Sequence, residues 1–169
     1  MEDSLITIFS IILAAILMFI FPIMNTWERQ DDISYMSIYA DTVEFVDSAR
    51  NLGYITLDMY ESFLKSIYAT GNTYDITLEH RNFEIIPSGD DYRSIYINSY
   101  TQSIIDKLQN DSSGNIYKMS EGDYFYVSVK NTNMTQATQL MEVVFASAQE
   151  PFRIGVPYGG MVRNSAPEN

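Results

Sequence analysis

LITIFSIILAAILMFIFPIM, residues 5–24, is the stretch that decides the fold of this chain. It contains no charged residue, and only Thr7, Ser10 and Pro22 interrupt its run of apolar side chains. A helix of this length rises roughly 30 Å, which matches the hydrocarbon core of a bilayer. Because hydrocarbon offers the backbone no water, a single span has to satisfy its own amides, and a helix does so. The stretch therefore predicts a helix held in a membrane or in the core of a filament.

The flanks of this stretch favour a retained anchor over a cleaved signal peptide. Glu2 and Asp3 precede it and suit a helix N-terminus, whereas a secretory signal begins with basic residues. No small-x-small cleavage site follows, and Trp27 lies where an interfacial aromatic residue belongs. Pro22 should kink the helix near its exit, because proline removes a backbone donor. We expect a transmembrane or filament-core helix over residues 1–27.

Residues 28–53 predict an amphipathic continuation of this helix. A charged collar at Glu28–Asp32 is followed by apolar residues at three- and four-residue steps, which is typical of a helix packed on a core. Gly53 is a candidate C′ residue, since glycine adopts the left-handed conformation that ends helices. The alternative is two helices broken near the collar. The apolar stripe consists of Ile33, Met36, Ala40, Val43, Val46 and Ala49.

Residues 54–164 predict an α+β head, with a small, mostly antiparallel sheet packed with helices. Strict alternation from Tyr74 to His80 predicts a half-buried strand. The last residues, 165–169, predict a flexible tail. A hairpin of 116–119 with 124–131 is also expected, and in its second strand Phe125, Val127 and Val129 alternate on one face. The other expected elements are a helix capped by Thr56 and closed by Thr70-Gly71-Asn72, a helix over about 92–108, a helix capped by Asn133 or Thr135, and strands at 152–156 and 161–162 on either side of a bend at 157–160.

Composition limits the classes of function. The 169 residues carry a net charge of −12, so phosphate would be repelled and no nucleic-acid partner is expected. The chain has no cysteine, which excludes disulfides, thiolate metal sites and cysteine nucleophiles. The 13 Tyr and 9 Phe suit contacts between proteins, because tyrosine buries area at small entropic cost. We expect no cofactor, no metal ion and no small-molecule substrate.

Few side chains suggest catalytic chemistry. His80 is the only histidine, so a Ser-His-Asp triad would have to use it, but no nucleophile motif accompanies it. Its simpler interpretation is a strand-edge residue with a local partner. Asp90 and Asp91 suit a helix cap, and Asp111–Asn115 lacks the ligand spacing and final Glu of an EF-hand. We therefore do not expect an enzyme.

The layout of the chain resembles that of a type IV pilin-like subunit: a short polar start, an uncharged span with proline near its end, an amphipathic continuation and a compact head. Pro22 matches the place where many pilin helices kink. The resemblance covers nearly the whole chain and implies a structural subunit of a bacterial cell-surface pilus or of its assembly base. Segments similar to those of TadE-like minor pilins of tight-adherence (Tad/Flp) pili are Phe45–Arg50, Gly53–Tyr60, Ala69–Ile76, Tyr126–Asn131 and Tyr158–Val162.

A subunit of this kind would be a single-pass membrane protein with an extracytoplasmic head, and its function would be mechanical. The membrane would shield residues 5–24 before assembly, and copies of itself or other pilin-like subunits would shield them in an extracellular filament. Leu5 stands where the main pilin families carry a glutamate, so Glu2 or Asp3 would pair with a neighbour's N-terminal amine and set the register. The helix-packing positions, where small residues let backbones approach, are Ile11, Ala14, Ala15, Met18 and Pro22.

Two other functions stay open at this point. One is a single-pass, membrane-anchored extracytoplasmic binding module or secretion-system component that does not polymerise. The other is a membrane-tethered hydrolase that uses His80, and an active His80→Ala protein would exclude it.

Overall fold

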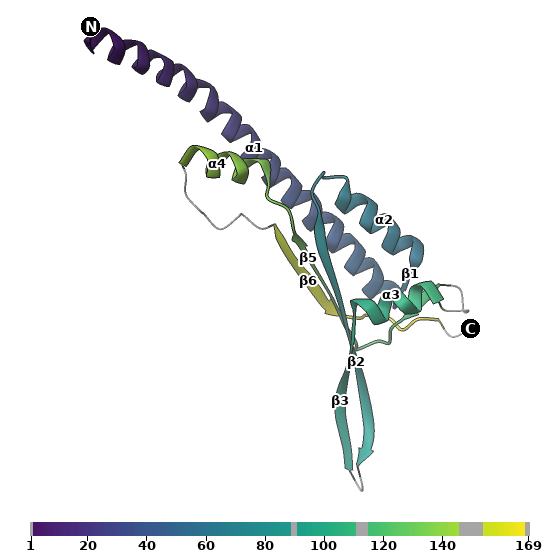
Figure 1. Cartoon of the computed structure of the whole chain (residues 1–169). Helices are drawn as coiled ribbons and strands as arrows, with labels where there is room; N and C mark the ends of the chain where they lie inside the picture. The colour runs from purple at the N-terminus through teal and green to yellow at the C-terminus, as the bar shows by residue number, and fades with distance from the viewer. Residues whose placement is uncertain (1, 89–90, 111–114, 146–153, 168–169) are drawn as a thin grey trace. The chain divides into compact units, whose positions relative to one another are not determined.

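The computed structural model describes residues 2–88, 91–110, 115–145 and 154–167, and it has the expected α+β architecture: a long apolar N-terminal helix followed by antiparallel sheets packed with helices (Figure 1). The chain forms two compact units, residues 1–34 with 134–152, and residues 35–133 with 153–169, which we call the head. The elements are α1 (Glu2–Leu52), β1 (Tyr54–Thr56), α2 (Leu57–Tyr68), β2 (Tyr74–Ser88), β3 (Asp91–Tyr100), α3 (Thr101–Asn110), β4 (Ile116–Lys118), β5 (Tyr124–Asn131), α4 (Gln136–Phe145) and β6 (Gly155–Met161).

Helix α1 is unbroken over its 51 residues, so the alternative of two helices is wrong. Within its apolar part, the Ser10 hydroxyl donates to the carbonyl of Ile6 at 2.8 Å. The Thr26 hydroxyl donates in the same way to the carbonyl of Pro22, also at 2.8 Å. These hydroxyls bond to the helix backbone, so neither of them needs water as an acceptor.

Gly53 ends α1, as the sequence predicts. Its φ is +76°, and its N–H donates to the carbonyl of Ala49 at 2.9 Å. A Cβ at this position would collide with the carbonyl oxygen of Asn164. Only glycine therefore meets both the conformation and the close approach of the C-terminal segment.

The first residues of the expected tail hydrogen-bond to the head. The Ser165 hydroxyl accepts from the N–H of Glu121 at 3.0 Å. The Ala166 N–H donates to the carbonyl of Met119 at 3.1 Å. The C-terminal segment is thus tied to the turn between β4 and β5.

The buried face of α1 differs from the expected apolar stripe. Val46 and Ala49 are buried, but Ile33 and Met36 are 68% and 67% exposed. Thr42 lies on the buried face, where its hydroxyl donates to the helix backbone at 2.6 Å. The spacing of apolar residues does not predict this face, because a buried face also accepts polar side chains that have hydrogen-bond partners. The buried positions are Asp31, Ser34, Ile38, Thr42, Phe45, Val46 and Ala49.

The head contains a four-stranded antiparallel sheet in the order β3-β2-β5-β6 and a two-stranded sheet of β1 and β4. The alternation predicted for β5 is confirmed, with Phe125, Val127 and Val129 buried. The expected hairpin of 116–119 with 124–131 is wrong, since β4 pairs with β1 while β5 pairs with β2 and β6. The Gly122 turn between them, with φ at +93°, passes the chain from one sheet to the other instead of closing a hairpin.

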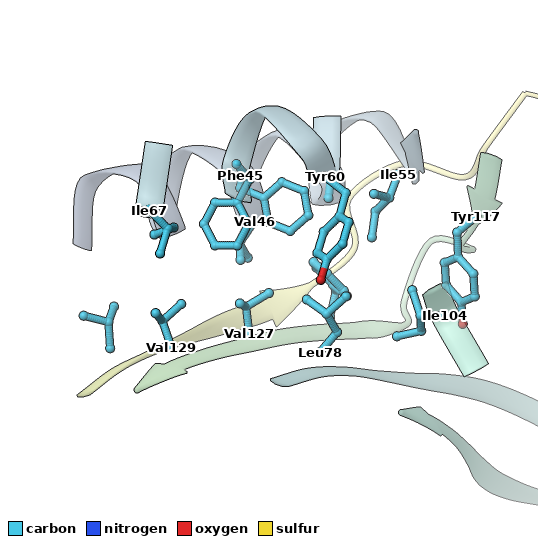
Figure 2. Close-up of a cluster of buried hydrophobic side chains, with 14 of the residues drawn as sticks. Phe45, Val46, Ile55, Tyr60, Ile67, Leu78, Ile104, Tyr117, Val127 and Val129 are labelled. Carbon is cyan, nitrogen blue, oxygen red and sulfur yellow. The ribbon is translucent and has the colours of Figure 1, made fainter. Parts of the chain in front are cut away.

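Phe45 of α1 lies in the core of the head, between α2 and the sheet (Figure 2). Its ring stacks on Phe63 of α2 with 4.5 Å between centroids, and it meets Phe125 of β5 edge-on at 6.1 Å. Such aromatic pairs contribute about 0.5–1.5 kcal/mol beyond the area they bury. Helix α2 begins after the predicted cap, Thr56, whose hydroxyl oxygen accepts from the N–H of Met59 at 3.2 Å.

The helix expected over 92–108 is wrong in its first half. Strand β3 covers Asp91–Tyr100, and only Thr101–Asn110 is helical. Asp91, expected to cap a helix, is instead the first residue of this strand. The segment is rich in tyrosine and isoleucine, which fit a pleated surface, and it pairs with β2 along its whole length.

Strand β6 continues through residues 157–160, where the sequence predicts a bend. It is an edge strand, so the missing N–H of Pro157 is tolerated. A Cβ on Gly159 would lie 2.7 Å from the carbonyl oxygen of Phe125, and one on Gly160 would lie 2.7 Å from the Arg50 guanidinium. Gly159 therefore allows close approach of β5, and Gly160 allows close approach of the Arg50 side chain from α1; the two glycines do not form a turn.

Candidate functional site

The first candidate site is the apolar surface of α1 over residues 4–19, every one of which is exposed. In the described part of the chain, α1 is the one helix that is long and apolar enough to cross a membrane, by length and composition. Exposure reaches 64% at Ile11 and 76% at Met18. The structure places the predicted packing residues on one side of the helix, because they recur at three- and four-residue steps: Ile11, Ala14, Ala15, Met18 and Pro22.

This surface is unfavourable in water. Each isoleucine- or leucine-sized side chain that is removed from water contributes about 1.5–3 kcal/mol. Soluble monomers rarely expose a contiguous apolar patch of more than a few hundred Å². Contact of this surface with lipid or with another protein would therefore be favourable. The side chains of Glu2 and Asp3, which are the predicted register charges, lie outside the described residues.

Asp31 is a buried carboxyl group in the unit that contains α4. Its side chain is hydrogen-bonded to that of Thr135, whose hydroxyl oxygen accepts from the N–H of Thr138 at 3.3 Å and so caps α4. The structure thus selects Thr135 over Asn133 as the cap. Burial raises the pKa of Asp31 above its usual 3.8, and the charge of Asp32 raises it further, while the Thr135 bond lowers it. The sequence places Asp31 in a charged collar and gives no indication of this contact with Thr135.

His80 belongs to a buried polar cluster with Tyr117 and Asp123. Its Nδ1 lies 2.8 Å from the Tyr117 hydroxyl, and its Nε2 lies 2.9 Å from Asp123 Oδ2. The three side chains are 4%, 3% and 1% exposed. The carboxylate of Asp123 also accepts from the backbone N–H of Ser120 at 2.8 Å and of Phe83 at 2.9 Å. The cluster therefore ties β2, the start of β5 and the segment after β4 together.

The geometry of this cluster fixes the proton on His80. Asp123 can only accept, so Nε2 carries the hydrogen, and the neutral ring accepts at Nδ1 from Tyr117. Burial lowers the pKa of His80 below 6.5, although the hydrogen bond and charge of Asp123 act in the opposite direction. Burial likewise raises the pKa of Tyr117. Both ring nitrogens are occupied by buried groups, so neither faces a ligand.

A shallow acidic hollow lies between α1 and α2 in the head. Its volume is about 360 Å³, and Asp41, Glu44 and Asp58 line it beside the rings of Phe45 and Phe63. Burial raises the pKa of Asp41, the charge of Glu44 adds to this, and a bond from Ser37 lowers it. Among the described residues no group of three His, Cys, Asp or Glu side chains is placed to hold a metal ion. The calcium-like segment lies largely in 111–114, outside those residues.

The solvent face of the main sheet is rich in exposed aromatic side chains. Phe83 and Tyr96 face each other across β2 and β3 with 5.4 Å between centroids, and Tyr96 is 6.5 Å from Tyr124 of β5. The sequence gives no indication of this surface, because its spacing predicts a helix where β3 lies. Residues 92–100 do not alternate between apolar and polar side chains, and their enrichment in tyrosine and isoleucine was the available signal for a strand. The large apolar side chains on this face are Phe83, Ile85, Tyr92, Tyr96, Tyr100, Tyr124, Tyr126 and Met161.

The sites above are defined by geometry alone. Comparison with protein-family models, with curated proteins and with solved structures finds no match to this chain.

Proposed function

We propose that this protein is a membrane-anchored, pilin-like structural subunit of a bacterial cell-surface pilus or of its assembly base. The observation that carries the proposal is the exposed apolar part of α1, which continues as one unbroken helix into a segment that packs on the sheet of the head. A helix of this kind both anchors a subunit and transmits force from an assembled core to its head. The proposed partners are the membrane and other copies or other pilin-like subunits.

In the proposed mechanism, contacts between α1 and lipid are replaced by contacts between α1 helices of neighbouring subunits. The bilayer covers residues 5–24 in the free subunit, and the helices of neighbouring subunits cover them after assembly. Ala14 and Ala15 allow close approach of backbones between Ile11 and Met18, which fill the gaps on either side. The proposed function needs no catalytic step, and it is compatible with a His80 whose two ring nitrogens are held by buried partners.

The decisive test replaces the two small residues without changing the polarity of the helix. An Ala14→Leu plus Ala15→Leu variant keeps an apolar span and stays in the membrane fraction, but its added bulk separates neighbouring helices. We expect loss of filaments in electron micrographs of sheared surface material. Leu13→Phe adds bulk on the opposite side of α1 and is the matched control. Normal filaments from the double variant would overturn the packing role of this face.

A non-polymerising, membrane-anchored binding module is the second candidate. It is favoured by the exposed tyrosines of the sheet, because aromatic residues are enriched where proteins bind one another. The two functions differ in the state of the wild-type protein on cells. A module that does not polymerise would stay entirely in the membrane fraction after shearing, and the surface fraction would contain none of it.

A further inference from the structure

Strand β3 forms an uncovered edge of the main sheet. In the described part of the chain, no strand pairs with its outer side. Strand β5 pairs with β2 only as far as Arg81, so residues 82–88 and 91–97 form a two-stranded ribbon beyond the rest of the sheet (Figure 1). Two-stranded ribbons are marginally stable on their own, and long apolar edges are normally protected.

Hydrogen bonds of β2 show which residues of β3 point their backbone groups outward. The N–H of Leu78 bonds to Thr101 beyond the end of β3, whereas the N–H of Phe83 bonds to Asp123 on the β5 side. The backbone N–H and C=O groups of even-numbered β2 residues therefore point toward β3. The register pairs these residues with odd-numbered residues of β3, whose backbone groups point back toward β2. The residues of β3 that direct N–H and C=O away from the sheet are Tyr92, Ser94, Tyr96, Asn98 and Tyr100.

The outward edge is self-complementary. YRSIYINSY, residues 92–100, reads the same in both directions by residue class, with Tyr96 at its centre. An antiparallel pair of two such strands centred on Tyr96 places tyrosine opposite tyrosine, isoleucine opposite isoleucine and polar opposite polar. A two-fold interface between identical chains requires this kind of symmetry. The opposed pairs are Tyr92 with Tyr100, Arg93 with Ser99, Ser94 with Asn98, and Ile95 with Ile97.

Charge also permits a second copy at this edge, although the chain as a whole has a net charge of −12. Asp91 and Arg93 are the only charged residues of β3, and their charges cancel. In the centred register Arg93 lies opposite Ser99 and Asp91 opposite Thr101, so no like charges face each other. The edge is thus a strip without net charge on an acidic protein, so it adds no repulsion of its own between two copies.

We propose that β3 pairs antiparallel with β3 of a second copy, with Tyr96 on the two-fold axis, to join two heads through one continuous sheet. Tyr92, Tyr96 and Tyr100 are 76%, 55% and 57% exposed, and the pairing continues their aromatic row from one copy into the next. Cross-strand aromatic pairs stabilise such ladders. This contact does not depend on the filament proposed above, because it uses the head and leaves the apolar part of α1 free.

Disulfide trapping tests the register, and the chain suits it because it has no cysteine of its own. The full-length Tyr96→Cys variant is oxidised in detergent micelles, which cover the apolar part of α1. We expect a disulfide-linked dimer, since opposed residues of an antiparallel pair lie within disulfide distance. Ser94→Cys alone and Asn98→Cys alone should not cross-link, because each lies about 14 Å from its own counterpart, four residues along the partner strand. An equimolar mixture of these two variants should cross-link.

A second experiment measures the unmodified contact. Ser94→Pro removes an N–H that points outward and leaves the ladder with β2 intact, whereas Ser94→Thr keeps that N–H and is the control. By light scattering in micelles we expect the wild type and Ser94→Thr to be dimers and Ser94→Pro to be a monomer of unchanged circular dichroism. A monomeric wild type would overturn the proposal, and the edge of β3 would then be available to a strand of another protein. Equal cross-linking at all three cysteine positions would do so too.

Discussion

Replacing Asp123 with alanine should be among the most damaging single changes in the head. Its carboxylate is 1% exposed and accepts from three N–H groups, those of His80, Ser120 and Phe83, at 2.8–2.9 Å. Alanine leaves the buried Nε2–H of His80 without an acceptor and removes the carboxylate partner of the part-buried N–H groups of Ser120 and Phe83. A hydrogen bond to a charged group contributes about 1.5–3 kcal/mol, so we expect a loss of about 3 kcal/mol or more in the free energy of unfolding. Typical domains have only about 5–15 kcal/mol in total.

The assay is urea unfolding of the full-length protein in micelles, followed by near-ultraviolet circular dichroism of its aromatic side chains. Asp123→Asn keeps the size of the side chain and one acceptor oxygen, so its loss should be smaller than that of Asp123→Ala. Asp106→Ala is the matched control, because Asp106 is exposed and accepts a hydrogen bond from Gln102 on the surface of α3. We expect Asp106→Ala to change stability by less than about 0.5 kcal/mol.

An Asp123→Ala protein within about 1 kcal/mol of the wild type would refute this reasoning. It would mean that water reaches the three donors, and that the cluster is not a buried link between strands. Loss of the near-ultraviolet signal without urea would agree with the prediction, since the variant would then be unfolded at the start.

Three further predictions follow from particular residues. Burial lowers the pKa of His80, so as the pH falls the unfolded chain binds a proton before the folded chain does. The contribution of His80 to stability is therefore complete above about pH 6.5 and is lost as the pH falls through the folded-state pKa. His80→Gln should reduce the change of the urea midpoint between pH 8 and pH 5. Gly159→Ala should cost about 1–3 kcal/mol, because its Cβ would press on Phe125 and Tyr126, whereas Gly155→Ala has open space and should leave the urea midpoint unchanged. Glu2→Ala plus Asp3→Ala should abolish surface filaments seen by electron microscopy but not membrane insertion, and normal filaments would show that neither acid sets the register.

Local patterns were sufficient for the elements whose signals lie close together in the chain. The uncharged run from Leu5 to Met24 predicts a helix by itself, and Gly53 predicts where that helix ends. Thr56 as a cap and the alternation of Tyr74–His80 and of β5 depend only on near neighbours, and the structure confirms all of them. These patterns hold because backbone hydrogen bonding and the pleat of a strand are set locally.

What the sequence by itself determined is a long apolar helix followed by an acidic α+β head. Only the tertiary structure decided that β3 is a strand, because its pairing with β2 outweighs local helical spacing. It also decided that Asp31 and His80 are buried, since polar groups enter a core only when distant partners such as Thr135 and Asp123 are present. Those partners are 104 and 43 residues away in the chain (135 − 31 and 123 − 80), and no pattern of neighbouring residues predicts these contacts.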